Sequence, residues 1–358
     1  MRIVIDIAHP AHVHFYRHLY GELIDAGHEV TVASRAKEMT LDLLDHYGIP
    51  HFPLAPLARG GLLSRGMELA KRDLGLVKLI RRTGSQLVLT RNPAGVQAAR
   101  LSGAFGIFDT DDGRAVGIHF HAAYPFAHLI TSPECLSDEF GRRHRRYRGF
   151  KAMAYLHPDR FTPDPLIRDR FGLSSSEPLF VVRFSAHDAS HDRLVQGIDP
   201  STRQTLIREL AAVGSVIVSN ESTGTLKYDA TSSPVAPELF HDLLAAADLC
   251  VGDSQSVAAE AALLGTPALR CSSFTGRVDY LRELEERFGM VSNYRPGDEA
   301  QLLAHVRAAL DDIDAVRLNA QTKHRHLLSA CEDVTSWYGQ LISAVCGEQQ
   351  RNRPPKKR

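Results

Sequence analysis

Short apolar runs alternate with amphipathic segments along nearly the whole chain, and this alternation limits the folds that the sequence can adopt. Arg2–Ile7 has the pattern of a buried strand, and Val13–Ala26 that of an amphipathic helix ended by Gly27. The same alternation continues to about residue 131, with Leu87–Thr90 as a further strand. It resumes from Leu179 to about residue 310, where Ala268–Cys271 is another predicted strand. Parallel strands need helical crossovers, so the sequence predicts an α/β fold in which helices cover both faces of parallel sheets.

Chain length and a change in composition predict two domains. The 358 residues exceed what one hydrophobic core usually organises, and the segment between about Tyr155 and Pro178 is rich in Pro, Asp and Arg, as linkers are. Two doubly wound Rossmann-like domains would bind ligands in a central cleft at the carboxyl ends of their strands. The expected parts are an N-terminal domain over residues 1–160, a C-terminal domain over 175–325, a closing helix over 326–348 and a basic disordered tail over 349–358.

The composition narrows the classes of partner. Lys and Arg together number 42 and so do Asp and Glu, which argues against general nucleic-acid binding. The five cysteines show no metal-binding spacing, and the chain starts with a strand and has no run of roughly 18 apolar residues. We therefore expect a cytoplasmic protein with reduced thiols. The arginine run Gly141–Arg148 allows either a peripheral contact with an anionic membrane or an ordinary solvated loop.

The segment DSQSVAAEAALLGTPALR, residues 253–270, predicts a strand-to-helix turn followed by a capped helix. Asp253, Ser254 and Ser256 can cap its first turn, where free backbone N–H groups favour an anion. Glu260 follows Ser256 by four residues and shares its helix face. A carboxylate at this place can hold a ribose diol. The alternative, which the same sequence pattern fits equally well, is an ordinary capped helix with a solvated Glu.

Three stretches together carry a family resemblance: DIAHPAHVHFYRHL with GHEVTVASR; VVRFSAHDASHD; and HDLLAAADLCVGDSQSVAAEAALLGTPALR with FTGRVDYLREL. The chain resembles the domain-of-unknown-function 354 family, a branch of the GT-B superfamily that also holds MurG-type glycosyltransferases and UDP-N-acetylglucosamine 2-epimerases. The resemblance covers most of residues 1–340. It implies a GT-B fold, a nucleotide-sugar donor that is UDP-linked, and catalysis without a metal or other cofactor.

The resemblance also implies a donor site in the C-terminal domain. DSQSVAAE is similar to the DSGG-x-QEE motif of the epimerases, with Gln255 and Ser256 in place of its two glycines. RFSAHDASHD stands where related proteins carry a loop that meets the leaving pyrophosphate; its two His-Asp pairs also allow a less favoured metal site. The residues implied in nucleotide-sugar binding are Arg183, Ser185, His187, Ser190, Asp253, Ser254, Gln255, Ser256 and Glu260.

The acceptor side is expected in the N-terminal domain. HPAHVHFYRHL resembles the HVFP segment of MurG-type transferases, which makes His12 a general base or a phosphate ligand, with a surface histidine cluster as the alternative. In DTDDGR, Asp109, Asp111 and Asp112 compete for the role of base, and Asp111 and Asp112 are the preferred candidates. A magnesium site built from these carboxylates is a less favoured alternative.

The leading functional hypothesis is a metal-independent glycosyltransferase acting from a UDP-sugar on a glycan or lipid-linked acceptor, with no nucleic-acid partner. One alternative is a UDP-sugar 2-epimerase, which Ala259 mildly disfavours because it replaces the first glutamate of the QEE pair. The other is a non-catalytic nucleotide-sugar-binding protein, suggested by the missing glycines.

Overall fold

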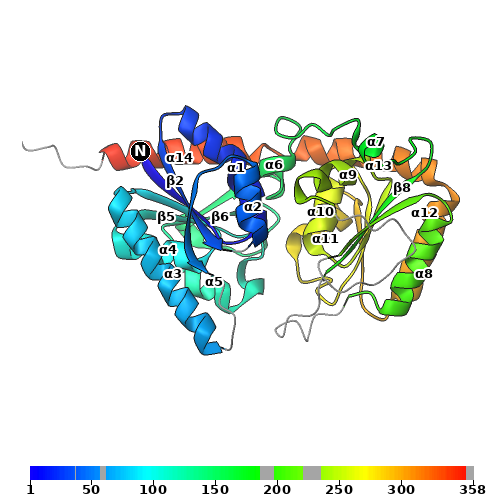
Figure 1. The fold of residues 1–358 in the computed structure, drawn as a ribbon, viewed down its shortest axis with the longest axis horizontal. Coiled ribbons are helices and arrows are strands. Elements are labelled where there is room, and N and C mark those ends of the chain that lie inside the picture. The colour runs from blue at the N-terminus through cyan, green and yellow to red at the C-terminus, as the bar shows by residue number, and fades with distance from the viewer. Residues whose placement is uncertain (37, 57–61, 186–196, 221–234, 352–358) are drawn as a thin grey trace, which may run out of the picture. The chain divides into compact units, whose positions relative to one another are not determined.

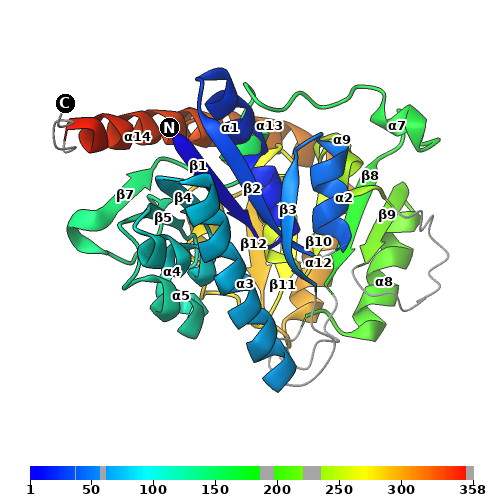
Figure 2. The ribbon, with the colours of Figure 1, turned by 60° about the vertical axis from the view of Figure 1, so that its left-hand side comes forward.

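The computed structural model describes residues 1–36, 38–56, 62–185, 197–220 and 235–351. The chain forms two compact units: the first consists of Met1–Arg160 with Cys331–Arg358, and the second is Phe161–Ala330. Each unit has its own parallel sheet (Figures 1 and 2).

The sheet of the first unit has seven parallel strands in the order β3-β2-β1-β4-β5-β6-β7. The strand order reverses between β1 and β4, which makes that point the topological switch of the sheet. Ligands of open α/β sheets bind at such a point, beyond the carboxyl ends of the strands. The strands are β1 (Arg2–Ile7), β2 (Glu29–Ala36), β3 (His51–Pro56), β4 (Leu87–Thr90), β5 (Phe105–Asp109), β6 (Leu129–Pro133) and β7 (His144–Tyr147).

Helices cover both faces of this sheet. The helices of the first unit are α1 (Pro10–Asp25), α2 (Glu38–His46), α3 (Leu62–Thr83), α4 (Pro93–Ser102), α5 (Ile118–Ala123), α6 (Met153–Leu156) and α14 (Val334–Arg351). Val4 and Val88 of the sheet form one core cluster with apolar residues of α3 and α4, which run side by side (Figures 1 and 2). The C-terminal helix α14 packs on α1, where the rings of Phe15 and Tyr338 lie 5.6 Å apart.

The sheet of the second unit has five parallel strands in the order β12-β11-β10-β8-β9. Its strand order reverses between β8 and β10, so the loops that follow these two strands flank the switch point. The strands are β8 (Leu179–Phe184), β9 (Ser215–Asn220), β10 (Leu249–Gly252), β11 (Ala268–Cys271) and β12 (Val291–Tyr294).

The helices of the second unit are α7 (Ile167–Arg170), α8 (Pro200–Ala211), α9 (Phe240–Ala246), α10 (Gln255–Leu263), α11 (Asp279–Glu286), α12 (Glu299–Asp311) and α13 (Ile313–Ala330). Leu269 and Cys271 of β11 belong to a core cluster with Leu206 of α8 and Val306 of α12. The opposite face of the sheet carries α9, α10 and α11 (Figure 1). Side chains that alternate along β11 therefore face α8 and α12 or α9 to α11 in turn.

The α/β fold with parallel sheets covered by helices is confirmed, and β1, β4 and β11 have the predicted bounds. The expected single closing helix over 326–348 is wrong. The chain forms two helices there, because Asp333 interrupts the run and its carboxylate accepts a hydrogen bond from Thr335 N at 2.9 Å, at the start of α14. Helix α14 also continues to Arg351, into the tail expected to be disordered from residue 349.

The arginine run proves to include an edge strand. His144 pairs with Ile130 of β6, and the register continues through Tyr147. Two of its guanidinium groups are used locally: Arg143 donates to Ala127 O at 2.8 Å and Arg146 donates to Asp138 O at 2.7 Å. No helix among the described residues is long and apolar enough to cross a membrane.

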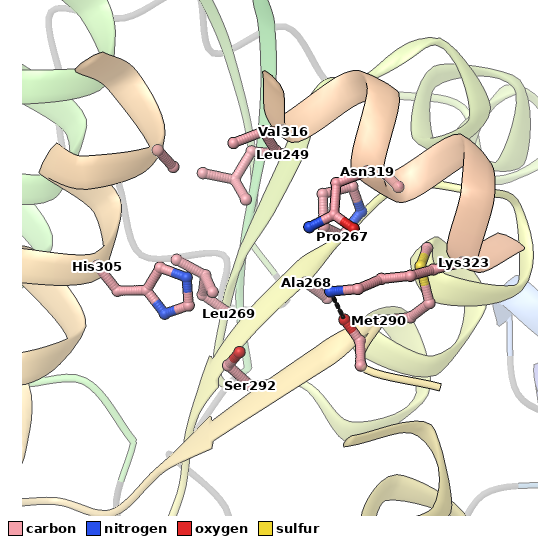
Figure 3. A pocket seen from close by; sticks show the side chains of 13 residues that line it. Leu249, Pro267, Ala268, Leu269, Met290, Ser292, His305, Val316, Asn319 and Lys323 are labelled. Atoms are coloured by element: carbon pink, nitrogen blue, oxygen red, sulfur yellow. Dashed lines mark hydrogen bonds between the residues drawn. The ribbon is translucent and has the colours of Figure 1, made fainter. Parts of the chain in front are cut away.

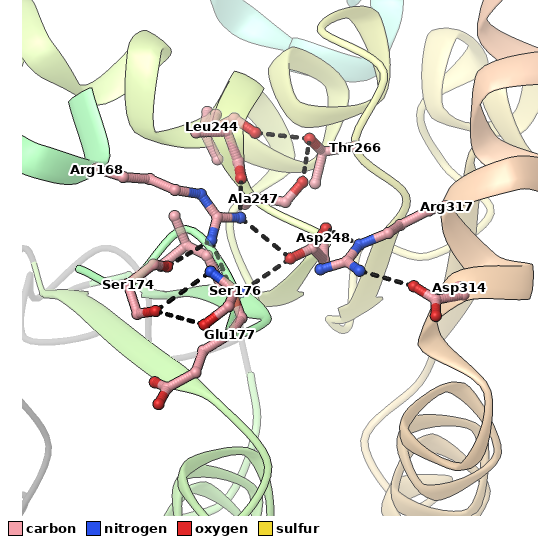
Figure 4. A network of polar contacts seen from close by, with 12 residues as sticks. Arg168, Ser174, Ser176, Glu177, Leu244, Ala247, Asp248, Thr266, Asp314 and Arg317 are labelled. Carbon is pink, nitrogen blue, oxygen red and sulfur yellow. Dashed lines mark hydrogen bonds and ion pairs between the residues drawn. The ribbon is translucent and has the colours of Figure 1, made fainter. Parts of the chain in front are cut away.

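Asp248 ties three parts of the second unit together (Figure 4). It lies just before β10 and is buried. Its carboxylate accepts hydrogen bonds from Leu179 N at 2.8 Å, from Arg168 of α7 at 3.3 Å and from Arg317 of α13. This network attaches the segment expected to be a linker to the sheet of the second unit.

Candidate functional site

Asp253 joins the two loops at the switch point of the second sheet. One carboxylate oxygen accepts a hydrogen bond from Ser185 N, after β8, at 2.6 Å; the other accepts from Arg203 of α8 at 3.1 Å. The side chain of Asp253 is buried. We therefore assign Asp253 a role in holding the loops after β8 and β10 in place, and Arg203, which the sequence did not single out, neutralises its charge.

Helix α10 begins directly after this turn, as predicted. Ser254 is its N-cap, and the Ser254 hydroxyl accepts a hydrogen bond from Val257 N at 3.5 Å. Gln255 is partly exposed and Ser256 is exposed, so the first turn of the helix is accessible. Backbone N–H groups of a first helical turn have no partner within the helix and can bind an anion. The hydroxyl of Ser254 serves the cap, which leaves backbone N–H groups as the anion donors here.

Glu260 has a partner that sequence reasoning missed. His241 of α9 places Nε2 at 3.6 Å from Glu260 Oε2, and the two side chains are only 6% and 13% exposed. Burial raises the pKa of the Cys250 thiol to about 12, and the nearby Glu260 carboxylate adds to the shift. Cys250 lies in β10, so the Glu260 carboxylate lies between α10, α9 and the sheet instead of in solvent.

The third expected part of this site is only partly described. Arg183 lies at the carboxyl end of β8, where its Nη1 atom donates to Ser219 Oγ and its guanidinium lies 5.8 Å from the ring centroid of Phe240. His187 and Ser190 lie outside the described residues. The structure thus brings Arg183, Ser185, Asp253 and the start of α10 to one edge of the sheet.

Two carboxylates of DTDDGR are tied into buried ion pairs in the first unit. Asp109 accepts hydrogen bonds from Tyr338 at 2.8 Å and from Thr131 at 3.0 Å, and it pairs with Arg91. Asp111 pairs with Arg91 and, at 2.6 Å, with Lys151. Burial alone would raise the pKa of Asp111, but the charges of Lys151 and Arg91 outweigh it and hold that pKa well below its usual value. Asp111 is therefore ionised and fixed.

Asp112 has the opposite electrostatic environment. Burial, followed by the negative charge of neighbouring Asp111, raises the pKa of Asp112 to about 6. Two adjacent carboxyl groups whose pKa values are driven apart are typical of an acid/base site, because the group that titrates near neutrality exchanges protons most effectively. Within DTDDGR, Asp112 is accordingly the group suited to accept a proton.

His12 lies in the first turn of α1, beyond the carboxyl end of β1. Its Nδ1 atom accepts a hydrogen bond from Ala8 N at 3.3 Å. Burial, and then the charge of Arg91, hold the pKa of His12 well below its usual value, so the ring is neutral. A neutral imidazole that accepts at Nδ1 carries its proton on Nε2. His12 is thus a hydrogen-bond donor, and this geometry argues against its use as a general base.

Solved structures with the same architecture are numerous. MnaA of S. aureus in complex with UDP has 15% sequence identity and a TM-score of 0.68, over 99% of this chain and 98% of that one. A UDP-GlcNAc 2-epimerase from Neisseria meningitidis bound to UDP-GlcNAc has 12% identity and a TM-score of 0.64, over 89% and 94%. The glycosyltransferase VinC in complex with dTDP has 15% identity and a TM-score of 0.63, over 96% and 99%.

The chain has the GT-B fold. Identities this low establish the GT-B architecture alone. The sequence matches no family model, and no curated protein matches it. Any assignment of residues to a donor site or an acceptor site in this chain therefore depends on the geometry of the chain itself and on the motif resemblance.

A cavity of about 130 Å³ lies elsewhere in the second GT-B unit (Figure 3). Its lining includes Leu249 and Ala268, the first residues of β10 and β11, together with His305 of α12 and Lys323 of α13. Lys323 Nζ donates to Gly289 O at 3.0 Å. The cavity is therefore at the amino ends of the strands, the edge opposite to the start of α10, and is not the candidate nucleotide site.

Proposed function

We propose that this GT-B protein is a glycosyltransferase that moves a sugar from a nucleotide donor, with UDP as the favoured nucleotide, to a hydroxyl of a glycan or lipid-linked acceptor. The observation that carries the proposal is Glu260, a largely buried carboxylate on the helix that starts at the switch point of the second sheet. The likeness to MnaA in complex with UDP, to the Neisseria epimerase bound to UDP-GlcNAc and to VinC in complex with dTDP supports it. Membership of the domain-of-unknown-function 354 family is part of the same proposal.

The donor would bind to the second unit. Glu260 accepts hydrogen bonds from the ribose hydroxyls, since an ionised carboxylate only accepts. The first-turn N–H groups at Gln255 and Ser256, the Ser185 region and Arg183 hold the diphosphate. His187 and Ser190 belong to this proposed site on the motif resemblance.

The acceptor would bind to the first unit, with Asp112 as the base. As the acceptor oxygen bonds to the anomeric carbon, Asp112 takes its proton and the bond from that carbon to the diphosphate oxygen breaks. The electron pair leaves with the nucleoside diphosphate, whose charge the helix N-terminus and Arg183 stabilise without a metal. Asp111 stays ionised beside Lys151, and His12 donates a hydrogen bond through Nε2.

A UDP-sugar 2-epimerase is the second candidate, favoured by the likeness to the Neisseria enzyme. Ala259 argues against it, since the resembling motif has a glutamate there. Incubation with UDP-N-acetylglucosamine, followed by product analysis, separates the candidates. Released UDP supports the transferase, a new UDP-sugar supports the epimerase, and binding without either product supports a non-catalytic binder. Asp112→Asn serves as the control, because it should remove turnover and leave UDP binding intact.

A further inference from the structure

Five residues of the second sheet stand side by side at its carboxyl edge. Strand register places Ser219 next to Arg183, Arg183 next to Gly252, Gly252 next to Arg270 and Arg270 next to Asn293. Residues in register on parallel strands point to the same face of a sheet. The face is that of α9 to α11, since the neighbours of Arg270 along β11 pack toward α8 and α12, and Arg183 lies over Phe240 of α9.

Glycine in the middle of this row leaves a gap between two arginines. A Cβ atom at Gly252 would lie 2.0 Å from Arg183 O, so no larger residue fits without a backbone shift. Adjacent strands are about 4.8 Å apart, which puts the Arg183 and Arg270 backbones roughly 10 Å from one another. The chain turns from Gly252 into the first turn of α10, so the two arginines flank the start of that helix.

Arg270 is an unusual buried cation. Only 1% of the residue is exposed. Its Nη1 atom donates to Asn293 Oδ1 at 3.0 Å and to Thr275 Oγ1 at 3.4 Å, whereas Nε and Nη2 have no hydrogen-bond partner among the residues that the structure describes. Burial lowers the pKa of Arg270, yet a guanidinium stays protonated at neutral pH. Unmet donors on a buried charge are costly unless an anion supplies the acceptors.

We propose that Arg270 binds an anionic oxygen of the donor diphosphate, beside Arg183 and the N-terminus of α10. The inference rests on the proposed function, because the diphosphate is that of the nucleotide-sugar donor. Arginine suits this position, since its planar donors match phosphate oxygens and form charge-assisted hydrogen bonds. The assignment also compensates for the glycines that the turn lacks, because a guanidinium can replace contacts that a closer backbone would make.

Calorimetry of the full chain with uridine, UMP and UDP tests the assignment. Arg270→Met should weaken UDP binding roughly 10- to 100-fold and leave uridine binding unchanged, because only UDP carries the diphosphate. Arg287→Met is the matched control: this exposed arginine of the same unit pairs with Glu283, and its loss should change neither affinity. Unchanged UDP binding in Arg270→Met, or an equal loss for uridine, overturns the assignment.

Two measurements remain decisive if Arg270→Met does not fold. Arg270→Lys keeps the charge but loses the fork of donors, and should bind UDP with an affinity between those of wild type and background. In the wild type, a buried arginine Nε–H resonance should shift when UDP is added and not when uridine is added; the lack of any such shift overturns the assignment. A wild type that does not bind UDP at all would overturn the proposed function as well, whereas wild-type binding with an unaffected Arg270 overturns this inference alone.

Discussion

His241 Nε2 lies 3.6 Å from Glu260 Oε2, so a side chain of α9 holds the carboxylate that α10 carries. The pair is largely buried, and each side chain limits the rotamers of the other. A helical glutamate that is merely solvated would have no such partner. Such a pairing favours one orientation of the Glu260 side chain, as the proposed recognition of a ribose diol would require.

Replacement of Glu260 should impair nucleotide binding. We expect Glu260→Ala to weaken UDP binding by roughly 1–3 kcal/mol, because the ribose hydroxyls lose their acceptor inside the site. Calorimetry measures this directly. Glu286→Ala removes an exposed glutamate of the same unit and should leave the affinity unchanged. Wild-type affinity in Glu260→Ala would contradict the ribose assignment.

Turnover should depend on the ionisation of Asp112. Its pKa is raised to about 6, so the carboxylate that accepts a proton is populated above that pH. Release of UDP from UDP-N-acetylglucosamine in the presence of an acceptor should therefore rise between about pH 5 and 7 and then level off. In Asp112→Asn the residual rate should lose this rise. A pH profile that keeps its rise in the variant would assign the base to another residue.

The same raised pKa carries a cost in stability. The unfolded carboxyl ionises at its ordinary pKa, while the folded one keeps its proton up to about pH 6, so ionisation favours the unfolded state increasingly across that interval. The free energy of unfolding of Asp112→Asn should therefore exceed that of wild type by up to about 3 kcal/mol at pH 7, so the variant should unfold at a higher urea concentration. Near pH 4 the two proteins should differ little in stability. A variant that is less stable at pH 7 would argue that Asp112 has a structural role.

Removal of Asp248 should loosen the second unit. Burial tends to raise the pKa of Asp248, but hydrogen bonds from Arg317 and Leu179 N outweigh it and lower the pKa. The carboxylate therefore contributes stability above the ordinary aspartate pKa, and the contribution is lost as the pH falls through the lowered value. We expect Asp248→Ala to lower the free energy of unfolding, measured by urea denaturation at pH 7, by about 2–3 kcal/mol.

Asp314→Ala is the matched control for Asp248. Asp314 pairs with the same Arg317 at 2.8 Å, but its side chain is 85% exposed. An exposed pair contributes well under about 1 kcal/mol. Equal losses in the two variants would mean that Arg317, and not the buried position of Asp248, sets the stability.

Gly252 should not tolerate a side chain. An added Cβ would meet the backbone oxygen of Arg183, which cannot rotate away, so Gly252→Ala should destabilise the second unit by at least about 2 kcal/mol. Gly21→Ala provides the comparison, because that helical glycine has open space around it. The free energy of unfolding of this variant should rise by about 1 kcal/mol. Thermal unfolding of both variants checks the pair. A stable Gly252→Ala with normal UDP binding would show that the strands can separate.

Much of the fold was predictable because each central strand is an apolar run between polar loops. Arg2–Ile7 and Leu87–Thr90 match their predicted bounds, and all of their residues except Arg2 are buried. Strands β7 and β12 were missed for a physical reason: an edge strand needs fewer apolar residues, and His144–Tyr147 reads as a charged loop. The division of the C-terminal region into α13 and α14 was missed because one helical pattern runs through Asp333.

The site was predictable only where one segment supplies it. The cap at Ser254 and the face of Glu260 follow from local spacing. No local pattern marks three further residues, because each contacts a residue of another segment. Lys151 pairs with Asp111, His241 lies beside Glu260, and Arg270 donates a hydrogen bond to Asn293. The roles of Asp111 and Asp112 also could not be separated from the letters DTDDGR, because the difference comes from Arg91 and Lys151, which bind only one of the two.

The hydrogen bond from Tyr338 to Asp109 joins residues 229 positions apart. During synthesis the ribosome releases Asp109 long before Tyr338, and the whole second unit emerges between them. The first unit therefore lacks α14, and with it the Tyr338 partner of Asp109, until the end of the chain has been translated. Most of the first unit is translated before the second, yet the first unit can be completed only after the whole second unit has been translated.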